Sequence, residues 1–131
     1  MLLQKVKVEN PTFKANGKIY YSISGYDKDG YFYNVEKRYN DFKTLHDWLS
    51  WRFLGLYVPE VPPKKAIGNK DSKFIEERRF QLEDFLHNLT RHQYLYKSDD
   101  FRTWVRSTGS NDLFSPMKEK IRNNIKSLSV Q

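Results

Sequence analysis

The hydrophobic period of this sequence changes near residue 40, and that change restricts the fold more than any other feature. Before it, apolar and polar side chains alternate over residues 3–8, 18–24 and 31–39, as in strands that bury one face. Residues 27–30, Asp-Lys-Asp-Gly, form a turn signal between the last two segments. We therefore expect three antiparallel strands in the N-terminal part of the chain.

From residue 40 onward, apolar residues recur at the three- to four-residue spacing of amphipathic helices. Asn40 or Asp41 is a suitable cap for the first helix. Asp71 or Ser72 is a suitable cap for a second helix, which is expected to run to about Thr90. The inward stripe of the first helix is formed by Phe42, Leu45, Leu49 and Phe53.

Two further helical segments follow. Ser98 is expected to cap a short helix near residues 98–106, and Pro116 to begin a helix over residues 116–130. Strands that precede helices in this way are typical of an α+β fold, here a three-stranded antiparallel sheet packed against a helical subdomain of three to four helices. The 131 residues suffice for one domain with a single core.

A proline-rich segment connects the first two predicted helices. Residues 58–65 read V-P-E-V-P-P-K-K, and three prolines in five residues exclude a helix or a central strand. We expect a stiff, extended connection that holds Lys64 and Lys65. The two lysines suit an anionic surface. The loop behind them carries Ala66 and Ile67, an apolar tip that is suited to enter such a surface. The alternative is a connector whose lysines are only solvated.

Composition limits the function to a few classes. The chain has 23 Lys and Arg residues against 16 Asp and Glu, a formal charge of +7, which favours an anionic partner such as nucleic acid or a membrane surface. The absence of cysteine excludes disulfides, thiolate metal sites and cysteine nucleophiles. No apolar run is long enough to span a bilayer, and the N-terminus lacks the apolar centre of a signal peptide. We therefore expect a soluble, cytosolic domain.

An arginine interrupts the apolar stripe of the second predicted helix. At ~100° per residue, Arg78 falls in the same arc as Ile75 and Leu82, and Arg79 lies at the edge of that arc. Because a guanidinium does not lose its charge, an inward Arg78 needs an anionic partner. The partner is either a ligand or an internal Asp or Glu; otherwise the side chain extends to solvent along its apolar stem.

A second basic feature ends the third predicted strand. Arg38 and Tyr39 lie on opposite faces of that strand, or side by side where the chain turns into the first helix. A planar guanidinium suits the paired oxygens of a phosphate, and a tyrosine ring suits the apolar face of a sugar or cyclitol. The alternative is a solvated arginine beside a packed tyrosine.

Three motifs together resemble phox-homology (PX) domains of the sorting-nexin type. K-R-Y-N-D-F, at residues 37–42, resembles the R-R-Y-x-x-F element of that family. V-P-E-V-P-P-K, at residues 58–64, is similar to its apolar-P-x-x-P-x-K element, and F-I-E-E-R-R-F-Q-L-E-D-F-L, at residues 74–86, to the helix that follows. The resemblance covers residues 3–105 and implies a sheet against a helical subdomain with a Pro-rich loop, the same α+β fold that the period change predicts.

The resemblance also implies a binding site for the headgroup of phosphatidylinositol 3-phosphate. In the implied site, Arg38 holds the 3-phosphate and Tyr39 stacks under the inositol ring. Lys64 meets the 1-phosphate, and Arg78 binds the 4- and 5-hydroxyls. All four positions carry the residue type that the family uses there.

Further residues belong to the expected site through the same resemblance. Lys37 stands where the family has an arginine, and together with Lys65 and Arg79 it is expected to be a secondary basic residue that is able to take a second phosphate. Ala66 and Ile67 lie where family members insert an apolar loop into the bilayer.

The PX-like domain is expected to span residues 1–108, and a linker with a basic amphipathic helix to span residues 109–131. Such a helix suits a membrane interface, or docks on the surface of its own domain. Sorting nexins with a BAR coiled coil carry a helix of this kind, so a dimer is expected if a BAR-like region follows. The apolar stripe consists of Met117, Ile121, Ile125 and Leu128, and the flanking basic residues are Lys118, Lys120, Arg122 and Lys126.

The expected function is a phosphoinositide-binding module for endosomal sorting, cytoplasmic and peripheral on endosomal membranes, with coat or sorting-complex proteins as partners. No enzymatic activity, metal or cofactor is expected, because the histidines lack metal-ligand spacing and no glycine-rich phosphate loop is visible. Two alternatives stay open: a nucleic-acid-binding domain that stacks bases on its aromatics, and a protein-docking PX-like module with weak lipid binding.

Overall fold

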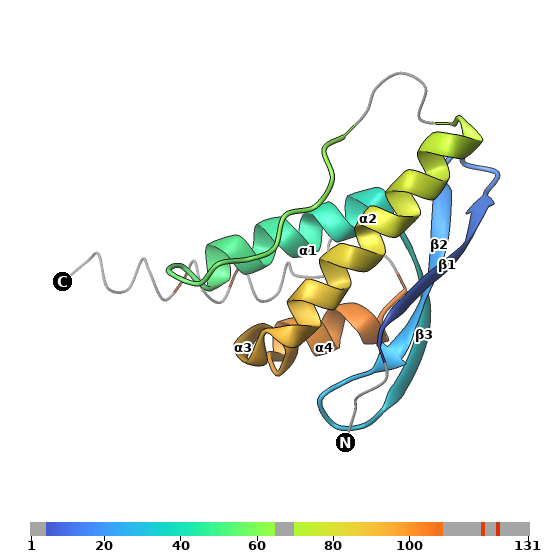
Figure 1. Cartoon of the computed structure of the whole chain (residues 1–131). Helices are drawn as coiled ribbons and strands as arrows, with labels where there is room; N and C mark the ends of the chain where they lie inside the picture. The colour runs from blue at the N-terminus through green and yellow to red at the C-terminus, as the bar shows by residue number, and fades with distance from the viewer. Residues whose placement is uncertain (1–4, 65–69, 109–118, 120–122, 124–131) are drawn as a thin grey trace.

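The helices of this protein lie on one side of a three-stranded sheet (Figure 1). The computed structural model describes residues 5–64, 70–108, 119 and 123. Strands β1 (Lys7–Phe13), β2 (Ile19–Tyr26) and β3 (Phe32–Arg38) pair antiparallel in the order β1-β2-β3. The helices are α1 (Tyr39–Arg52), α2 (Ser72–Arg91), α3 (Gln93–Tyr96) and α4 (Asp99–Arg106). This arrangement confirms the predicted α+β fold.

The inner face of the sheet is apolar and packs against the helices. Tyr21 and Ile23 of β2 are buried, and Tyr33 of β3 lies opposite Gly25. A Cβ at position 25 would lie only 2.6 Å from the Tyr33 hydroxyl oxygen. The close approach of this ring explains a glycine inside a strand that otherwise alternates.

β1 lies further along the chain than the sequence pattern indicates. The alternation predicts a strand over residues 3–8, whereas β1 continues to Phe13. A register shift between Glu9 and Thr12, with Asn10 at φ 53°, accommodates Asn10 and Pro11 in the strand. The bulge interrupts the alternation of side chains between the two faces of the sheet. The period-two pattern in the sequence therefore ends before the bulge, and so does the predicted strand.

α1 begins earlier than predicted, because its N-cap is Arg38 and not Asn40 or Asp41. Asp41 Oδ2 instead accepts a hydrogen bond from the backbone N–H of Arg38 (2.9 Å), which closes the first turn. The predicted inward stripe is confirmed. Its residues Phe42, Leu45 and Leu49 are buried, and Phe53 packs partly against the core.

The predicted starts of α2 and α4 are confirmed. The carboxylate of Asp71 accepts from the backbone N–H of Lys73 at the start of α2, and the Ser98 hydroxyl accepts from the backbone N–H of Phe101 at the start of α4. The sequence pattern misses α3, a single turn capped by His92, because four residues are too few to establish a period.

The Pro-rich segment up to Lys64 has neither helix nor strand, as its prolines predict, and it runs back along α1 toward the start of α2 (Figure 1). The expected membrane-contact residues 65–67 lie outside the described part of the chain. The same holds for the expected helix over residues 116–130, apart from positions 119 and 123. Within the described ranges, no helix is both long and apolar enough to cross a bilayer.

Candidate functional site

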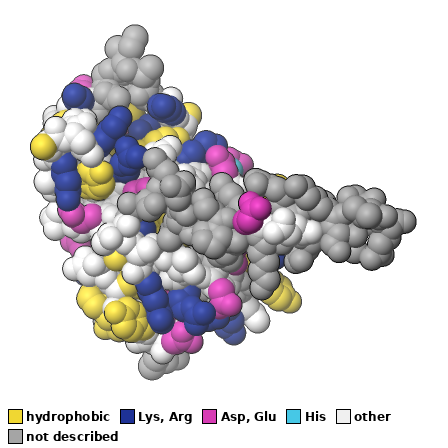
Figure 2. All heavy atoms as spheres, turned by 180° about the vertical axis from the view of Figure 1, so that it is seen from behind, with side chains coloured by type: hydrophobic (Ala, Val, Ile, Leu, Met, Phe, Trp, Pro, Cys, Tyr) yellow, Lys and Arg dark blue, Asp and Glu magenta, His cyan; other side chains and the backbone are white. Residues whose placement is uncertain are grey.

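A basic cavity of about 380 Å³ lies where the β1–β2 turn, the start of α1, the Pro-rich segment and the first turns of α2 meet. Five of its lining residues are Lys or Arg and none is Asp or Glu. Seen from behind, Lys and Arg side chains gather at the upper end of the molecule (Figure 2). The volume suits a small anionic ligand. The lining residues are Gly17, Lys18, Ile19, Tyr21, Arg38, Tyr39, Asn40, Lys64, Lys70, Phe74 and Arg78.

Arg38 reaches the basic cavity because it ends a strand and caps a helix. Its backbone is extended (φ −105°, ψ 168°), whereas the next residue, Tyr39, is already helical. The chain turns between them, so both residues line the cavity, which is the side-by-side arrangement that the sequence allowed. Among the salt bridges of the described residues, none involves the Arg38 guanidinium. Its charge is therefore available to a ligand.

Tyr39 joins the start of α1 to the Pro-rich segment. Its hydroxyl donates a hydrogen bond to the carbonyl oxygen of Pro62 (2.5 Å). This bond orients the ring at the wall of the cavity and holds the Pro-rich segment against α1. Lys64, two residues further on, lines the same cavity with an exposed side chain.

Arg78 is the most unusual residue of the cavity, because its guanidinium is buried and has no carboxylate partner within the part of the chain that the structure describes. The residue is 7% exposed, and its Nη2 donates to the carbonyl oxygen of Pro63 (2.6 Å). The guanidinium carbon lies 4.0 Å from the ring centroid of Tyr39 and 4.5 Å from that of Phe74. Its Nε is buried and has no hydrogen-bond partner among the described residues. Burial lowers the pKa of Arg78 below its usual value, yet an arginine stays charged at neutral pH.

This environment distinguishes among the alternatives considered for Arg78. Among the described residues, no Asp or Glu lies within ion-pair distance of it, and its side chain does not extend to solvent. Aromatic faces and a carbonyl oxygen compensate part of the desolvation. The Nε–H of Arg78 is able to donate to an acceptor from outside the described residues.

Two lysines complete the rim of the cavity. Lys70 precedes α2 and is exposed. No sequence motif indicates that Lys18 lines the cavity, because a single lysine beside a β-turn is common on protein surfaces. Gly17 has φ +78°, and the turn that this conformation makes brings Lys18 to the cavity.

The structure places Lys37 away from the cavity, although the sequence resemblance suggested a secondary contact. Lys37 is 0% exposed, and its Nζ donates to the carbonyl oxygen of Ser107 (2.6 Å) and lies 4.7 Å from the Trp104 ring centroid. Burial lowers its pKa to about 8. Strand alternation is the reason: Lys37 faces the core on β3, and its neighbour Arg38 faces the other way.

Arg79 is also absent from the cavity lining. Its Nη1 donates to the carbonyl oxygen of Val8 on β1 (2.9 Å), and its Nε pairs with Glu76 (2.8 Å). The choice of Arg78 over Arg79 as the inward arginine therefore agrees with the geometry. The remaining expected residues Lys65, Ala66 and Ile67 lie outside the described residues.

A three-stranded antiparallel sheet against helices, with a basic cavity beside the strand–helix junction and the Pro-rich segment, defines the class as an α+β module with a candidate anion site. The chain belongs to the PX domain family, whose model matches residues 28–108, more than half of its length. This result confirms the resemblance seen in the three motifs.

Several curated proteins are similar to this chain. Vacuolar protein sorting-associated protein vps5 of Schizosaccharomyces pombe is 36% identical over 73 residues, which are 56% of this chain and 13% of that protein. Vacuolar protein sorting-associated protein 5 of Saccharomyces cerevisiae is 34% identical over 86 residues, 66% of this chain and 12% of that protein. Sorting nexin 1 of Arabidopsis thaliana is 35% identical over 75 residues, 56% of this chain and 19% of that protein. The chain thus spans less than a fifth of the length of these relatives.

Two solved structures have a similar fold. A designed CISK-PX domain superposes with a TM-score of 0.70 at 28% identity, over 79% of this chain and 100% of that one. The PX domain of mouse SNX19, determined with a bound sulphate ion, superposes with a TM-score of 0.55 at 19% identity, over 79% of this chain and 96% of that one. The second likeness concerns the fold alone.

Proposed function

We propose that this domain binds phosphoinositide headgroups, with phosphatidylinositol 3-phosphate as the preferred lipid, and thereby brings its protein to endosomal membranes. The observation that carries the proposal is the buried guanidinium of Arg78, which has no carboxylate partner among the described residues and an unpaired Nε–H. A phosphate, which is an anion at neutral pH, or the hydroxyl oxygens of an inositol ring supply the acceptors that the Arg78 guanidinium lacks.

Each wall of the cavity has a role in the proposed complex. Arg38 takes the 3-phosphate through its guanidinium fork, and Tyr39 stacks under the inositol ring. Arg78 donates to the 4- and 5-hydroxyls, whose oxygens supply acceptors for its unpaired Nε–H. Lys64 meets the 1-phosphate at the open side of the cavity, where the glycerol backbone leaves toward the bilayer.

The rim supports contact with the membrane around the headgroup. Lys18, Lys64 and Lys70 line the cavity, and each basic side chain near an anionic surface contributes about 1 kcal/mol. Ala66 and Ile67 follow Lys64 in the sequence and are proposed to enter the interface. The proposed setting is a peripheral one, with coat or sorting-complex proteins as partners and with a dimer if a BAR-like region follows.

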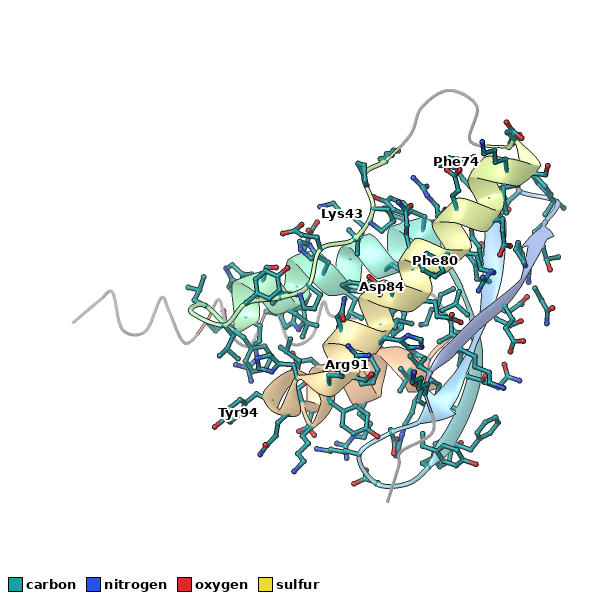
Figure 3. All side chains as sticks on the ribbon, in the orientation of Figure 1. Lys43, Phe74, Phe80, Asp84, Arg91 and Tyr94 are labelled. Atoms are coloured by element: carbon teal, nitrogen blue, oxygen red, sulfur yellow. The ribbon has the colours of Figure 1, made fainter. Side chains whose placement is uncertain are left out.

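The test is sedimentation with vesicles that contain phosphatidylinositol or one of its singly or doubly phosphorylated forms. We expect pelleting with the 3-phosphate lipid, and loss of pelleting in Arg38→Ala. Arg91→Ala is the matched control, because Arg91 is exposed near the opposite end of α2 from Phe74 (Figure 3). Equal pelleting of Arg38→Ala and Arg91→Ala contradicts the pocket assignment. Binding to any oligonucleotide with a steep salt dependence favours the nucleic-acid alternative.

A further inference from the structure

The two edge strands of the sheet differ in how their outward backbone groups are hydrogen-bonded. On the β1 edge, the backbone N–H of Val8 donates to Glu83 Oε2 (3.0 Å), and the Val8 carbonyl oxygen accepts from Arg79 Nη1 (2.9 Å). The carbonyl oxygen of Val6 accepts from His87 Nε2 (2.7 Å). Positions 79, 83 and 87 share one face of α2, so this helix acts as the missing neighbour of β1.

On the β3 edge, none of the described residues provides such a cover. The Asp27 N–H donates to the Tyr31 carbonyl oxygen across the hairpin, which fixes the alternation of the β2–β3 ladder. The backbone groups of Tyr33 and Val35 therefore face β2, whereas those of Phe32, Asn34 and Glu36 face outward. No hydrogen bond within the described part of the chain uses these outward N–H and C=O groups.

Space for another strand lies beside this edge. A cavity of about 460 Å³ is lined by Asn34, Val35 and Glu36 of β3, together with Lys14, Tyr20, Arg38, Asp41 and Thr108. Asn34 and Glu36 are exposed. Natural proteins usually protect such an edge with a bulge, a charge that points inward or a covering element, as β1 does with its bulge and α2.

We propose that the β3 edge docks an extended peptide segment of a partner protein, which adds to the sheet as a fourth strand. The outward backbone groups of Asn34 and Glu36 supply the hydrogen bonds. Phe32, which is 52% exposed and packs edge-on against Tyr26 (5.4 Å between centroids), supplies an aromatic anchor for an apolar side chain of the peptide. In the cavity beside this edge, Lys14 pairs with Glu36 (2.6 Å) and Asp41 Oδ2 accepts from the Arg38 backbone N–H. The Arg38 guanidinium has no ion pair among the described residues, so it favours an acidic residue of the peptide.

Amide hydrogen exchange of the free protein, followed residue by residue by NMR, tests the premise. The amides of Asn34 and Glu36 are expected to exchange rapidly, and those of Val8 and Val35 slowly. Protection of Asn34 and Glu36 in the dilute free chain means that another segment of this chain already occupies the edge, and overturns the proposal.

The docking itself is tested with a phage-displayed library of random dodecapeptides, panned on the full chain. The strongest binder is synthesised with a fluorophore and titrated by anisotropy. The critical variant is Asn34→Pro, which removes one outward N–H and leaves the β2–β3 ladder intact, with Asn34→Ala as its matched control. We expect Asn34→Pro to weaken binding at least tenfold and Asn34→Ala less than threefold, with the thermal midpoints of both close to that of the wild type.

A second readout uses only the wild-type protein, so it stands if Asn34→Pro fails to fold. Added peptide is expected to protect the amides of Asn34 and Glu36 from exchange. Equal affinity for Asn34→Pro and Asn34→Ala, protection at β1 in place of β3, or failure to select any binder overturns the proposal. Self-association that Asn34→Pro abolishes also overturns it, because the occupant is then a second copy of this chain. None of these results depends on lipid binding.

Discussion

The guanidinium carbon of Arg78 lies 4.0 Å from the centroid of the Tyr39 ring, and the two residues hydrogen-bond to adjacent residues of the Pro-rich segment. The Tyr39 hydroxyl donates to Pro62 and Arg78 Nη2 donates to Pro63. The strand–helix junction, the Pro-rich segment and α2 are thus tied together at one point. That point is the basic cavity, so the bonds that shape the cavity also join the elements that form it.

Tyr39→Phe separates the ring from its hydroxyl. The variant loses the bond to Pro62 but keeps the aromatic ring against which Arg78 packs. We expect a loss of about 1 kcal/mol in the free energy of unfolding, measured with urea, and a two- to fivefold weaker affinity for vesicles. Tyr94→Phe, at an exposed position of α3, is the control. Unchanged stability in Tyr39→Phe contradicts the structural role of the hydroxyl.

Arg78 is expected to oppose stability while it supports binding. Arg78 is a buried charge without an ion-pair partner among the described residues, and an apolar side chain of similar length in its place removes a desolvation penalty. We therefore expect Arg78→Met to be at least as stable as the wild type in urea, and to lose headgroup binding more than tenfold. Arg78→Lys is expected to lose binding as well, because an ammonium lacks the planar fork. A strongly destabilised Arg78→Met that still binds is the opposite result and contradicts this assignment.

Lys37 predicts a pH dependence of stability. Burial lowers its pKa to about 8, below the 10.5 of an exposed lysine. Between these values the unfolded chain holds the proton and the folded chain does not, so the penalty for burying Lys37 falls as the pH rises. The stability advantage of Lys37→Met over the wild type is expected to shrink by about 2 kcal/mol between pH 7.5 and 9.5. Urea unfolding of both proteins at both pH values measures it, and a constant difference contradicts it.

Gly25 is expected to tolerate no larger side chain, because Tyr33 occupies the space beside it. Gly25→Ala should destabilise the protein by about 2 kcal/mol, since the buried ring has to shift. Ser24→Ala, on the opposite face of β2, is the control. In the double variant Gly25→Ala with Tyr33→Phe, removal of the hydroxyl that meets the new Cβ is expected to recover part of this loss. Additive effects of the two changes argue against the clash.

The sequence predicts the helical half of this fold well, because caps and stripes are local signals. Asp71 and Ser98 are helix caps as expected, and Arg78 faces inward as its place in the apolar arc of α2 predicts. The bulge at Asn10 and Pro11 is defined by the pairing of β1 with β2. The sequence pattern within β1 alone does not indicate it.

Only some of the residues that line the basic cavity can be predicted from the sequence. The family motif places Lys37 beside Arg38, but strand alternation sends the two to opposite faces, and the alternation is the better guide. Lys18 reaches the cavity through the turn at Gly17, a tertiary effect without a sequence signal. The open β3 edge likewise appears only once the strand order and the hydrogen bonds from α2 to β1 are known.

The most direct measurement of the central claim is an NMR titration of the ¹⁵N-labelled protein with inositol 1,3-bisphosphate, the soluble headgroup of the proposed lipid. The side-chain Nε–H signals of Arg38 and Arg78 are reported together with the backbone amides. We expect saturable shifts of both arginine signals and of the amides near Tyr39 and Lys64, and none from sulphate at the same concentration. Unmoved Arg78 Nε–H at saturation, or equal shifts with sulphate, contradicts the proposed site.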